Sequence, residues 1–465
     1  MQRRTPSLVA EDALKIWQAG VNAVASDRLI ANHVDCWKSG LSFDRTLWRA
    51  AADSQICVVG AGKAGAGMAA GLERKLGSAW LSRTTGFVNV PDDCVRPLQA
   101  IHLHPSRPAG RNEPTEQGVQ GTEEILHRVS QLREQDLCLV LLSGGGSALL
   151  PAPVDGITLA DKLQVTRSLS RNGATISELN CVRRAISRVK GGGLLRACRA
   201  GLMVSLIISD VIGDPLDVIA SGPTVDLQVD CAAALKILRK LESQSAGSVP
   251  ESVMTFLQQT GRSHGSAARH ETSGPLPRSV NLVIGNNKTA VTAAAEEARR
   301  QGYSVPIFEW DQPGIAADCG RKLARALRQL NVSSSAPAKA GVCLISGGEP
   351  TVQLAETPGQ QKGGRNQELV LAATAELMNP PPIPTPWALL SGGTDGEDGP
   401  TDAAGAIIDS ELLETIRSSQ VDLDAYLSVN NSYPFFDQFG ALLKTGPTHT
   451  NVMDLRVAVC PPGEH

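Results

Sequence analysis

Aromatic residues are scarce in this chain, and long apolar runs are missing. Phe, Trp and Tyr make up 3% of the 465 residues. A core built instead from Ala, Val, Leu and Ile is typical of α/β proteins, whose helices lie close on a parallel sheet. No stretch approaches the ~20 apolar residues that a helix needs to cross a bilayer. The first residues lead into an amphipathic helix rather than a signal-peptide core, and we expect a cytoplasmic protein with no membrane partner.

An excess of charge of one sign is also missing. Lys and Arg total 44 and Asp and Glu total 47, giving a formal charge of −3. Nucleic acids and anionic surfaces are bound largely through clustered positive charge. We therefore expect no nucleic-acid partner.

The ten cysteines show neither a zinc signature nor a C-x-x-C pair. Cys57 and Cys138 stand inside apolar runs, where a free thiol usually acts as a small buried hydrophobe. This many free thiols favours a reducing compartment.

Short apolar runs alternate with helical segments along most of the chain. The first fifty residues have the spacing of helices, with Leu14, Trp17 and Val21 on one face. We expect strands at 56–59, 85–90, 98–103, 137–142, 203–208, 281–284, 342–345, 387–390 and 452–459. This alternation predicts parallel sheets in at least two α/β domains.

A change in composition separates the two expected domains. Between residues 260 and 279, Gly, Ser, Arg and His replace the apolar periodicity, as in a linker. We therefore place the domains at 1–270 and 280–465. A second flexible stretch is expected at 333–337.

Three of the expected strands end in Ser-Gly-Gly, beginning at Ser143, Ser346 and Ser391. Ligands of parallel sheets bind at the carboxyl ends of strands, where glycine lets a phosphate approach the backbone N–H groups. We therefore expect phosphate binding by the first of these loops, which consists of Ser143, Gly144, Gly145, Gly146 and Ser147. Each turn taken alone could equally be a tight connection without a ligand.

Residues 60–65 match the dinucleotide pattern G-x-G-x-x-G, a weak signal by itself. The acid expected about 20 residues further on is missing, because Asp92 and Asp93 follow only after about thirty. Lys63 also places an ammonium inside the turn, where it suits a carboxylate or a transferring phosphoryl group. A solvated surface lysine is the alternative.

Other cations follow glycines or precede them. Arg365 stands after Gly363 and Gly364 at the expected start of a helix, where its fork could bind a carboxylate or phosphate. Arg183, Arg184 and Lys190 form a second basic stretch before three glycines. An anion site and a solvated helix face are equally compatible with that stretch.

Carboxylates also follow the expected strands. Phosphoryl transfer requires Mg²⁺ held by one or two carboxylates and by nucleotide phosphates. The candidates are Asp210, Asp214, Glu349 and Asp395, although Asp and Gly are also common in plain loops.

Several motifs, in order, resemble class II glycerate kinases. In the first half these are the segments 60–64, 142–149, 178–183, 190–194 and 209–215. The segments 346–351, 363–368, 391–396 and 450–454 resemble the carboxyl-terminal MOFRL domain of that family. The resemblance implies ATP-dependent phosphorylation of D-glycerate to 2-phosphoglycerate with Mg²⁺. It also implies two α/β domains around a deep cleft, the first of them Rossmann-like with a largely parallel sheet. It places the family's catalytic lysine and arginine on Lys63 and Arg365.

We therefore predict that Lys63 and Arg365 hold the glycerate carboxylate and neutralise the transferring group in one anion pocket. Asp210, Asp214 and Asp395 are the predicted metal ligands. With the Ser143–Ser147 loop, the substrate and phosphate ligands are expected to be Asn180, Arg183, Lys190, Glu349 and Asn451. The rivals are an NAD-dependent hydroxypyruvate reductase and a non-catalytic sensor of small anions; the sequence leaves a homodimer open.

Overall fold

Contacts divide the chain into two compact units. One is Ser26–Ile284, called the amino-terminal unit below; the carboxyl-terminal unit combines Met1–Ala25 with Gly285–His465. This computed structural model describes residues 5–110, 113–245, 247–263, 275–309, 312–332, 341–357, 359 and 361–462. The expected flexible stretch 333–337 and most of the expected linker lie outside the described residues.

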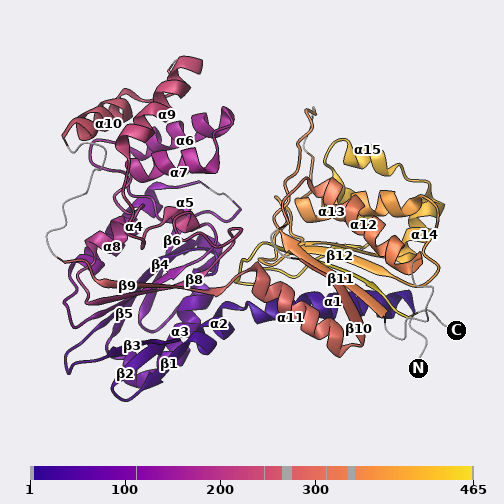
Figure 1. Cartoon of the computed structure of the whole chain (residues 1–465), viewed down its shortest axis with the longest axis horizontal. Coiled ribbons are helices and arrows are strands. Elements are labelled where there is room, and N and C mark those ends of the chain that lie inside the picture. The colour runs from indigo at the N-terminus through magenta and orange to yellow at the C-terminus, as the bar shows by residue number, and fades with distance from the viewer. Residues whose placement is uncertain are drawn as a thin grey trace. The chain divides into compact units, whose positions relative to one another are not determined.

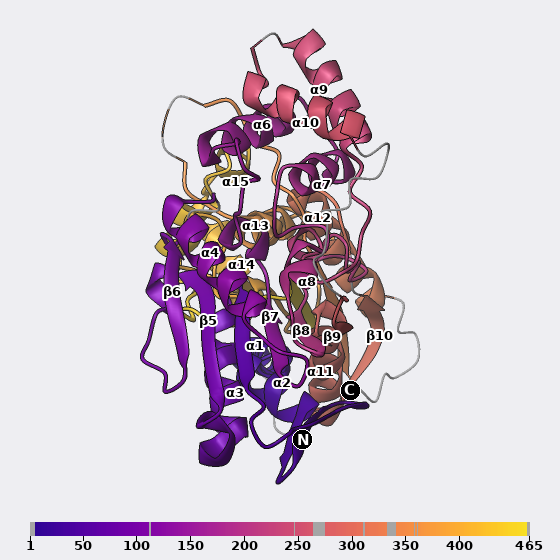
Figure 2. The ribbon, with the colours of Figure 1, turned by 90° about the vertical axis from the view of Figure 1, so that its left-hand side faces the viewer.

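The sheet of the amino-terminal unit has the strand order β6-β5-β4-β7-β8-β9. The pairs from β6 to β8 are parallel. In chain order β4 to β8 this is 3-2-1-4-5, the Rossmann arrangement, and the order reverses between β4 and β7. Figure 2 shows this row of strands from one side. The strands are β4 Ile56–Ala61, β5 Thr84–Pro91, β6 Ile101–Arg107, β7 Leu137–Leu142, β8 Leu202–Ile208 and β9 Arg278–Gly285.

Helices cover both faces of this sheet, which explains why β4, β7 and β8 are buried along their whole length. On one face lies α3 Gly65–Leu81. On the other, α4 Glu116–Ser130 and α8 Gly193–Ala197 pack on β4 and β7 through Ile125, Val129 and Leu194. The short α5 Gly146–Leu149 follows β7, the 3-10 turns η1 Asp92–Cys94 and η2 Ile219–Ser221 follow β5 and β8, and α2 Ser26–His33 packs on α3.

A group of helices stands beyond the end of this sheet (Figure 1). Its apolar core is formed by side chains such as Val165, Leu238 and Leu257. Its members are α6 Leu159–Arg171, α7 Ile176–Ala185, α9 Cys231–Gln244 and α10 Glu251–Ser263.

The expectation of helices through residue fifty is wrong in its last third. Residues 34–49 form an antiparallel sheet of β1 Val34–Trp37, β2 Gly40–Phe43 and β3 Thr46–Arg49. Each strand is only four residues long, too short for a sequence period to distinguish it from a helical turn.

The carboxyl-terminal unit is built on a sheet of order β10-β11-β15-β12-β13-β14. Only β10 and β11 are parallel; the other pairs are antiparallel. The expectation of a second parallel sheet is therefore wrong, because the last strand of the chain inserts between β11 and β12 in the opposite direction. The strands are β10 Tyr303–Glu309, β11 Gly341–Gly348, β12 Ala388–Gly393, β13 Gly405–Asp409, β14 Leu442–Leu443 and β15 Asp454–Cys460.

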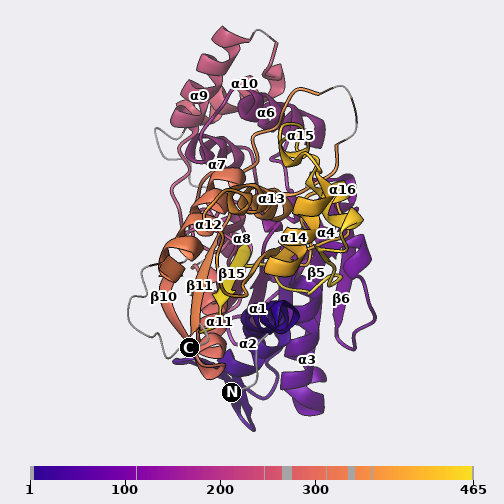
Figure 3. The same ribbon diagram turned by 90° about the vertical axis from the view of Figure 1, so that its right-hand side faces the viewer.

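Two layers of helices cover this second sheet (Figure 3). On one face lie α1 Pro6–Ala23 and α11 Asn287–Arg300, and Trp17 Nε1 donates to Gly392 O at 3.3 Å. The other face carries α12 Ala316–Val332, α13 Arg365–Met378, α14 Ser410–Ser419, α15 Leu423–Leu427 and α16 Ser432–Gln438. The first helix thus packs with the carboxyl-terminal half of the chain, which the expected boundaries 1–270 and 280–465 did not anticipate. In the described parts of both units, no helix is long and apolar enough to cross a membrane.

Candidate active site

The crevice at which the first sheet reverses its order is built from two loops. One follows β4 and contains Lys63; the other follows β7 and begins at Ser143. Gly62 lets them touch, because a Cβ there would lie 2.0 Å from Ser143 Oγ. Ligands of open α/β sheets bind at such a reversal.

The G-x-G-x-x-G turn does not offer its backbone to a ligand. The N–H groups of residues 62–65 donate to Asn89 O (3.2 Å), Gly144 O (2.9 Å), Ser143 Oγ (3.0 Å) and Gly62 O (3.0 Å). Asp92 follows directly on the end of β5, where a dinucleotide-binding protein has its ribose acid, so the count of residues alone was misleading. Its carboxylate instead accepts the N–H of Ala109 at 2.8 Å. These contacts argue against a dinucleotide pyrophosphate on this turn.

The Ser143–Ser147 loop does have free donors. Within the described part of the chain, the N–H groups of Gly144 and Gly145 have no acceptor. Gly145 has φ +79, and a Cβ there would lie 3.3 Å from Arg107 Nη2 and 3.7 Å from Lys63 Cγ. Two cations therefore flank this loop, and the sequence analysis had missed Arg107, which stands at the end of β6.

Beside the loop lies a cavity of about 530 Å³, formed within the amino-terminal unit. Seven of the residues predicted to bind substrate or phosphate line it, as does one predicted metal ligand. These residues are Ser143, Gly145, Gly146, Ser147, Asn180, Arg183, Lys190 and the metal candidate Asp210. They come from four separate segments of the chain. Asp214, a second predicted metal ligand, is not among the residues of this wall and adopts φ +53 in the following turn.

Lys190 braces the wall of this cavity. Its Nζ donates to Ser147 Oγ at 2.7 Å, to Ser147 O at 3.0 Å and to Ala220 O at 3.4 Å. Burial, together with the neighbouring cations Lys162 and Arg183, lowers the pKa of its ammonium. Lys190 therefore positions the loop after β7.

The three glycines after Lys190 serve the same wall. The N–H groups of Gly191 and Gly192 donate to Ser221 O (3.0 Å) and Gly222 O (2.7 Å). Ala220 and Ser221 adopt φ +49 and +64, a conformation that costs non-glycine residues free energy. Ser221 Oγ donates to Asn180 Oδ1 at 3.1 Å. A strained segment is thus held against the cavity by backbone and side-chain hydrogen bonds.

Lys162, which was not predicted from the sequence, also lines the cavity, from α6. A signal was present: Lys162 interrupts the apolar stripe formed by Leu159, Val165 and Leu169, all of which are buried. A lysine on the buried face of an amphipathic helix is rare unless it has a partner.

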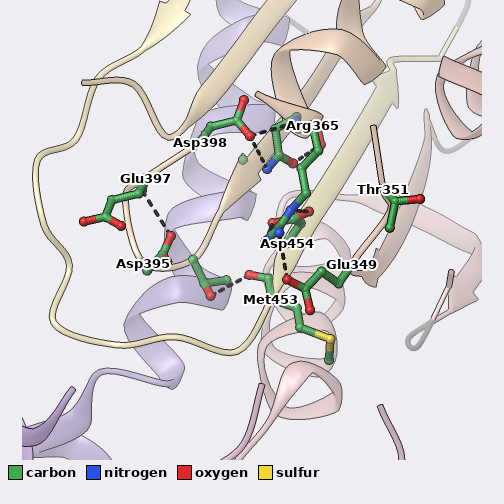
Figure 4. A network of polar contacts seen from close by, with 12 residues as sticks. Glu349, Thr351, Arg365, Asp395, Glu397, Asp398, Met453 and Asp454 are labelled. Atoms are coloured by element: carbon green, nitrogen blue, oxygen red, sulfur yellow. Dashed lines mark hydrogen bonds and ion pairs between the residues drawn. The ribbon is translucent and has the colours of Figure 1, made fainter. Parts of the chain in front are cut away.

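In the carboxyl-terminal unit, Arg365 meets two carboxylates (Figure 4). Its Nε and Nη2 donate to Asp454 Oδ2 (2.7 Å) and Oδ1 (2.9 Å), and its Nη1 donates to Glu349 Oε1 (2.7 Å). Burial alone would lower the pKa of Arg365, but the attraction of Asp454 and Glu349 outweighs it and the pKa is raised. Predicted residues Arg365 and Glu349 are therefore in contact, and Asp454 is their unforeseen partner.

The start of α13 is already capped by a carboxylate. Asp398 accepts the backbone N–H groups of Asn366 and Gln367, both at 2.9 Å. Gly364 makes room for it, since a Cβ there would lie 2.2 Å from the Asp398 carboxyl carbon. These two backbone donors at the start of α13 are therefore already used within the chain. Burial raises the pKa of Asp398 to about 7, although both N–H groups favour its charged form.

The other two Ser-Gly-Gly segments end beside Asp454. Gly348 of β11 and Gly393 of β12 are its register partners on either side. The next turn is held by Thr394, whose N–H and Oγ1 donate to Met453 O at 3.0 and 2.6 Å. The predicted residue Asn451 accepts the N–H of Met453 at 3.3 Å, and Asp395 accepts that of Glu397 at 3.1 Å. Figure 4 shows Asp395 and Glu397 apart from the Arg365 ion pairs.

Within the described residues, no group of three or more His, Cys, Asp or Glu is arranged to hold a metal ion. Mg²⁺ in kinases is held by one or two carboxylates and by substrate phosphates, and such a site needs no protein cage. Asp210 in the cavity wall fits that requirement.

The chain is similar to known proteins in both of its halves. Residues 12–258 match the model of a domain of unknown function, DUF4147, and residues 342–454 match the MOFRL family. The chain is 36% identical to the glycerate kinase of Rattus norvegicus, covering 98% of this chain and 94% of that protein. It is 37% identical to the glycerate 2-kinase of Pyrococcus horikoshii, over 76% of this chain and 77% of that one.

A solved structure is similar as well. The crystal structure of a glycerate kinase from Thermotoga maritima matches with a TM-score of 0.79 at 32% identity, covering 98% of this chain and 100% of that chain. Since these similarities extend over almost all of its length, the chain belongs to the glycerate kinase family.

Proposed function

We propose that this protein transfers the γ-phosphoryl group of ATP to the 2-hydroxyl of D-glycerate, giving 2-phosphoglycerate. The observation that carries the proposal is the cation-lined cavity beside the loops that follow β7 and β8 of a Rossmann-like sheet, in a member of this family. Phosphoryl transfer needs little covalent chemistry from the protein; it depends on positioning and on stabilising the charge of the transferring group.

The residues have distinct roles in this proposal. The free N–H groups of Gly144 and Gly145 bind phosphate oxygens, and Lys63 beside them neutralises the transferring group. Arg365 binds the substrate carboxylate, held in orientation by Asp454. Asn180 and Arg183 bind phosphate from the cavity wall, and Lys190 holds the loop in place. Glu349 and Asn451 are further ligands of the substrate.

Magnesium is the second component of the proposal. Bound to ATP, it neutralises the charge between the β- and γ-phosphates. Asp210 is the carboxylate best placed to contribute to it, because it lines the cavity. Asp214 and Asp395 stay candidates from the sequence.

The ten cysteines are free thiols, six of them buried. Burial raises the pKa of Cys57 to about 12, which suits an inert packing role. Free thiols in this number support the proposal of a cytoplasmic, reducing environment.

The decisive experiment identifies the product. Purified protein is incubated with ATP, Mg²⁺ and D-glycerate, and the product is assigned by ³¹P and ¹H NMR. 2-Phosphoglycerate with stoichiometric ADP is the expected result. 3-Phosphoglycerate would contradict the position of transfer, and NADH oxidation with hydroxypyruvate in place of ADP release would support the reductase.

The two catalytic cations have their own test. Lys63→Ala and Arg365→Ala should each lower kcat on the order of 10³-fold, because each removes a charge that stabilises the transition state. Lys236→Ala, an exposed lysine of α9, is the control and should be unchanged. Near-normal turnover in both variants would reject these roles.

A further inference from the structure

Lys162 is a buried cation for which the described part of the chain supplies no partner. Its residue is 4% exposed, and its Nζ has no hydrogen-bond acceptor among the described residues. It lies on the inner face of α6, with the apolar side chains of Val165 and Leu169 further along the same stripe. An unpaired ammonium away from water is costly, so this position is unfavourable unless a ligand supplies the missing anion.

The charges around Lys162 do not supply that anion. The charged side chains that line the same cavity are five cations and two carboxylates: Lys162, Arg167, Arg171, Arg183, Lys190, Glu113 and Asp210. Glu113 is bound to Arg167 by two hydrogen bonds of 2.8 and 2.7 Å. Burial and the neighbouring Arg183 lower the pKa of Lys162 to about 7. The cavity is thus cationic, and Lys162 would gain from a negative ligand.

The size and lining of the cavity suit a ligand larger than glycerate. At about 530 Å³ it falls in the range of sites for nucleotide-sized molecules, and a three-carbon acid would fill only a small part of it. Apolar side chains contribute to the wall as well, among them Leu163, Ile176 and Val218. A ligand with several negative charges at one end and a flat, less polar group at the other matches this lining.

We propose that this cavity binds the nucleotide and that Lys162 is a ligand of its polyphosphate. The inference rests on the proposed kinase function and extends it by locating the donor site. The loop that carries the free N–H groups of Gly144 and Gly145 contributes Ser143, Gly145, Gly146 and Ser147 to the same wall, so the terminal phosphates would lie between this loop and Lys162. A nucleoside triphosphate would bring the negative charge that Lys162 lacks in this cationic wall.

The test compares Lys162→Met, which keeps the length of the side chain and removes the charge, with Lys162→Arg, which keeps the charge. Exposed Lys236→Met on α9 is the matched control. For Lys162→Met we expect KM for ATP to rise about 10- to 100-fold, because a charge-assisted contact to phosphate is lost. KM for D-glycerate should stay within about twofold. Lys162→Arg should recover part of the affinity, and Lys236→Met should behave as the wild type.

Direct binding separates this inference from the proposed function. Titration calorimetry with ADP and with inorganic tripolyphosphate needs no turnover, so it remains informative even if glycerate is not the acceptor. At pH 8 the wild type should take up protons on binding tripolyphosphate, measured in buffers of different ionisation enthalpy, and Lys162→Met should take up fewer. The inference would be overturned if Lys162→Met raised KM for glycerate but left KM for ATP and the binding of tripolyphosphate unchanged. It would also be overturned if folded Lys162→Met had an unchanged KM for ATP and bound ADP and tripolyphosphate as tightly as the wild type.

Discussion

Asp454 holds Arg365 by two parallel hydrogen bonds, Nε to Oδ2 at 2.7 Å and Nη2 to Oδ1 at 2.9 Å. Asp454 is fully buried between the ends of two strands, whereas Arg365 retains some exposure. The guanidinium is therefore oriented before any substrate arrives, with Glu349 as its more exposed second partner.

Removing the buried partner should be costly. Asp454→Asn should lower the free energy of unfolding on the order of 3 kcal/mol, because it leaves Arg365 short of a buried counter-charge. Glu349→Gln is the matched control: its side chain is 47% exposed, and the expected loss is below about 1 kcal/mol. Urea denaturation measures both. Equal losses would mean that the two carboxylates share the role.

Charge alone should not replace the fork of Arg365. Arg365→Lys keeps a positive charge but cannot make the two-point contact with Asp454. We expect kcat/KM for glycerate to fall about 10- to 100-fold in this variant, less than for Arg365→Ala, since orientation is lost and charge is retained. Steady-state kinetics with both substrates varied gives the values. Full activity in Arg365→Lys would show that the guanidinium acts only as a point charge.

The conformation of Gly145 can be separated from its surroundings. Gly145→Ala and Gly173→Ala both place a Cβ at positive φ (+79 and +71), and each should cost about 1 kcal/mol of stability. At Gly173 nothing lies within 4 Å of that Cβ, whereas at Gly145 it approaches Arg107 and Lys63. Only Gly145→Ala should therefore lower kcat/KM. Equal losses of kcat/KM in Gly145→Ala and Gly173→Ala would mean that backbone strain, and not the contact with Arg107 and Lys63, lowers the activity.

The stability of the protein should depend on pH through Lys162. Its pKa is about 7 when folded, against 10.5 for an ordinary lysine, so between these values the unfolded chain binds more protons. The free energy of unfolding should therefore rise as pH increases from about 7 to 10. Lys162→Met removes this dependence and should be more stable than the wild type at pH 7 by on the order of 2 kcal/mol. Urea denaturation curves measured over a range of pH for the two proteins would reveal the difference. The same dependence of the free energy of unfolding on pH in both proteins would mean that the Lys162 ammonium is exposed to water.

Much of the first sheet could be predicted from the sequence. The strands at 56–59 and 137–142 were correct because both faces of a parallel strand are buried, which leaves a continuous apolar run. The strand at 452–459 was placed two residues early, and its antiparallel direction was not predicted. Strand direction follows from the path of the chain between strands, which an apolar pattern does not record.

The site shows the same division. The glycines of the Ser143–Ser147 loop and the cations Arg183 and Arg365 could be identified from the sequence, because such residues are rarely needed for packing alone. Arg107, Asp398 and Asp454 could not, since a single charged residue at the end of a strand or in a loop resembles any surface charge. Their importance comes from neighbours that are distant in the chain: Asp454 lies 89 residues from Arg365.

By itself, the sequence determined the family, the first α/β sheet and the loops that carry its glycines, because these depend on local backbone requirements and on continuous burial. Only the tertiary structure decided which donors are already used and which remain free. It showed that the N–H groups of the dinucleotide-like turn are occupied and that Lys190 holds a loop in place. It also showed that Lys162 is buried without a partner among the residues that the structure describes. The physical reason is that hydrogen-bond satisfaction and desolvation are properties of a folded neighbourhood, set by residues that the linear order keeps far apart.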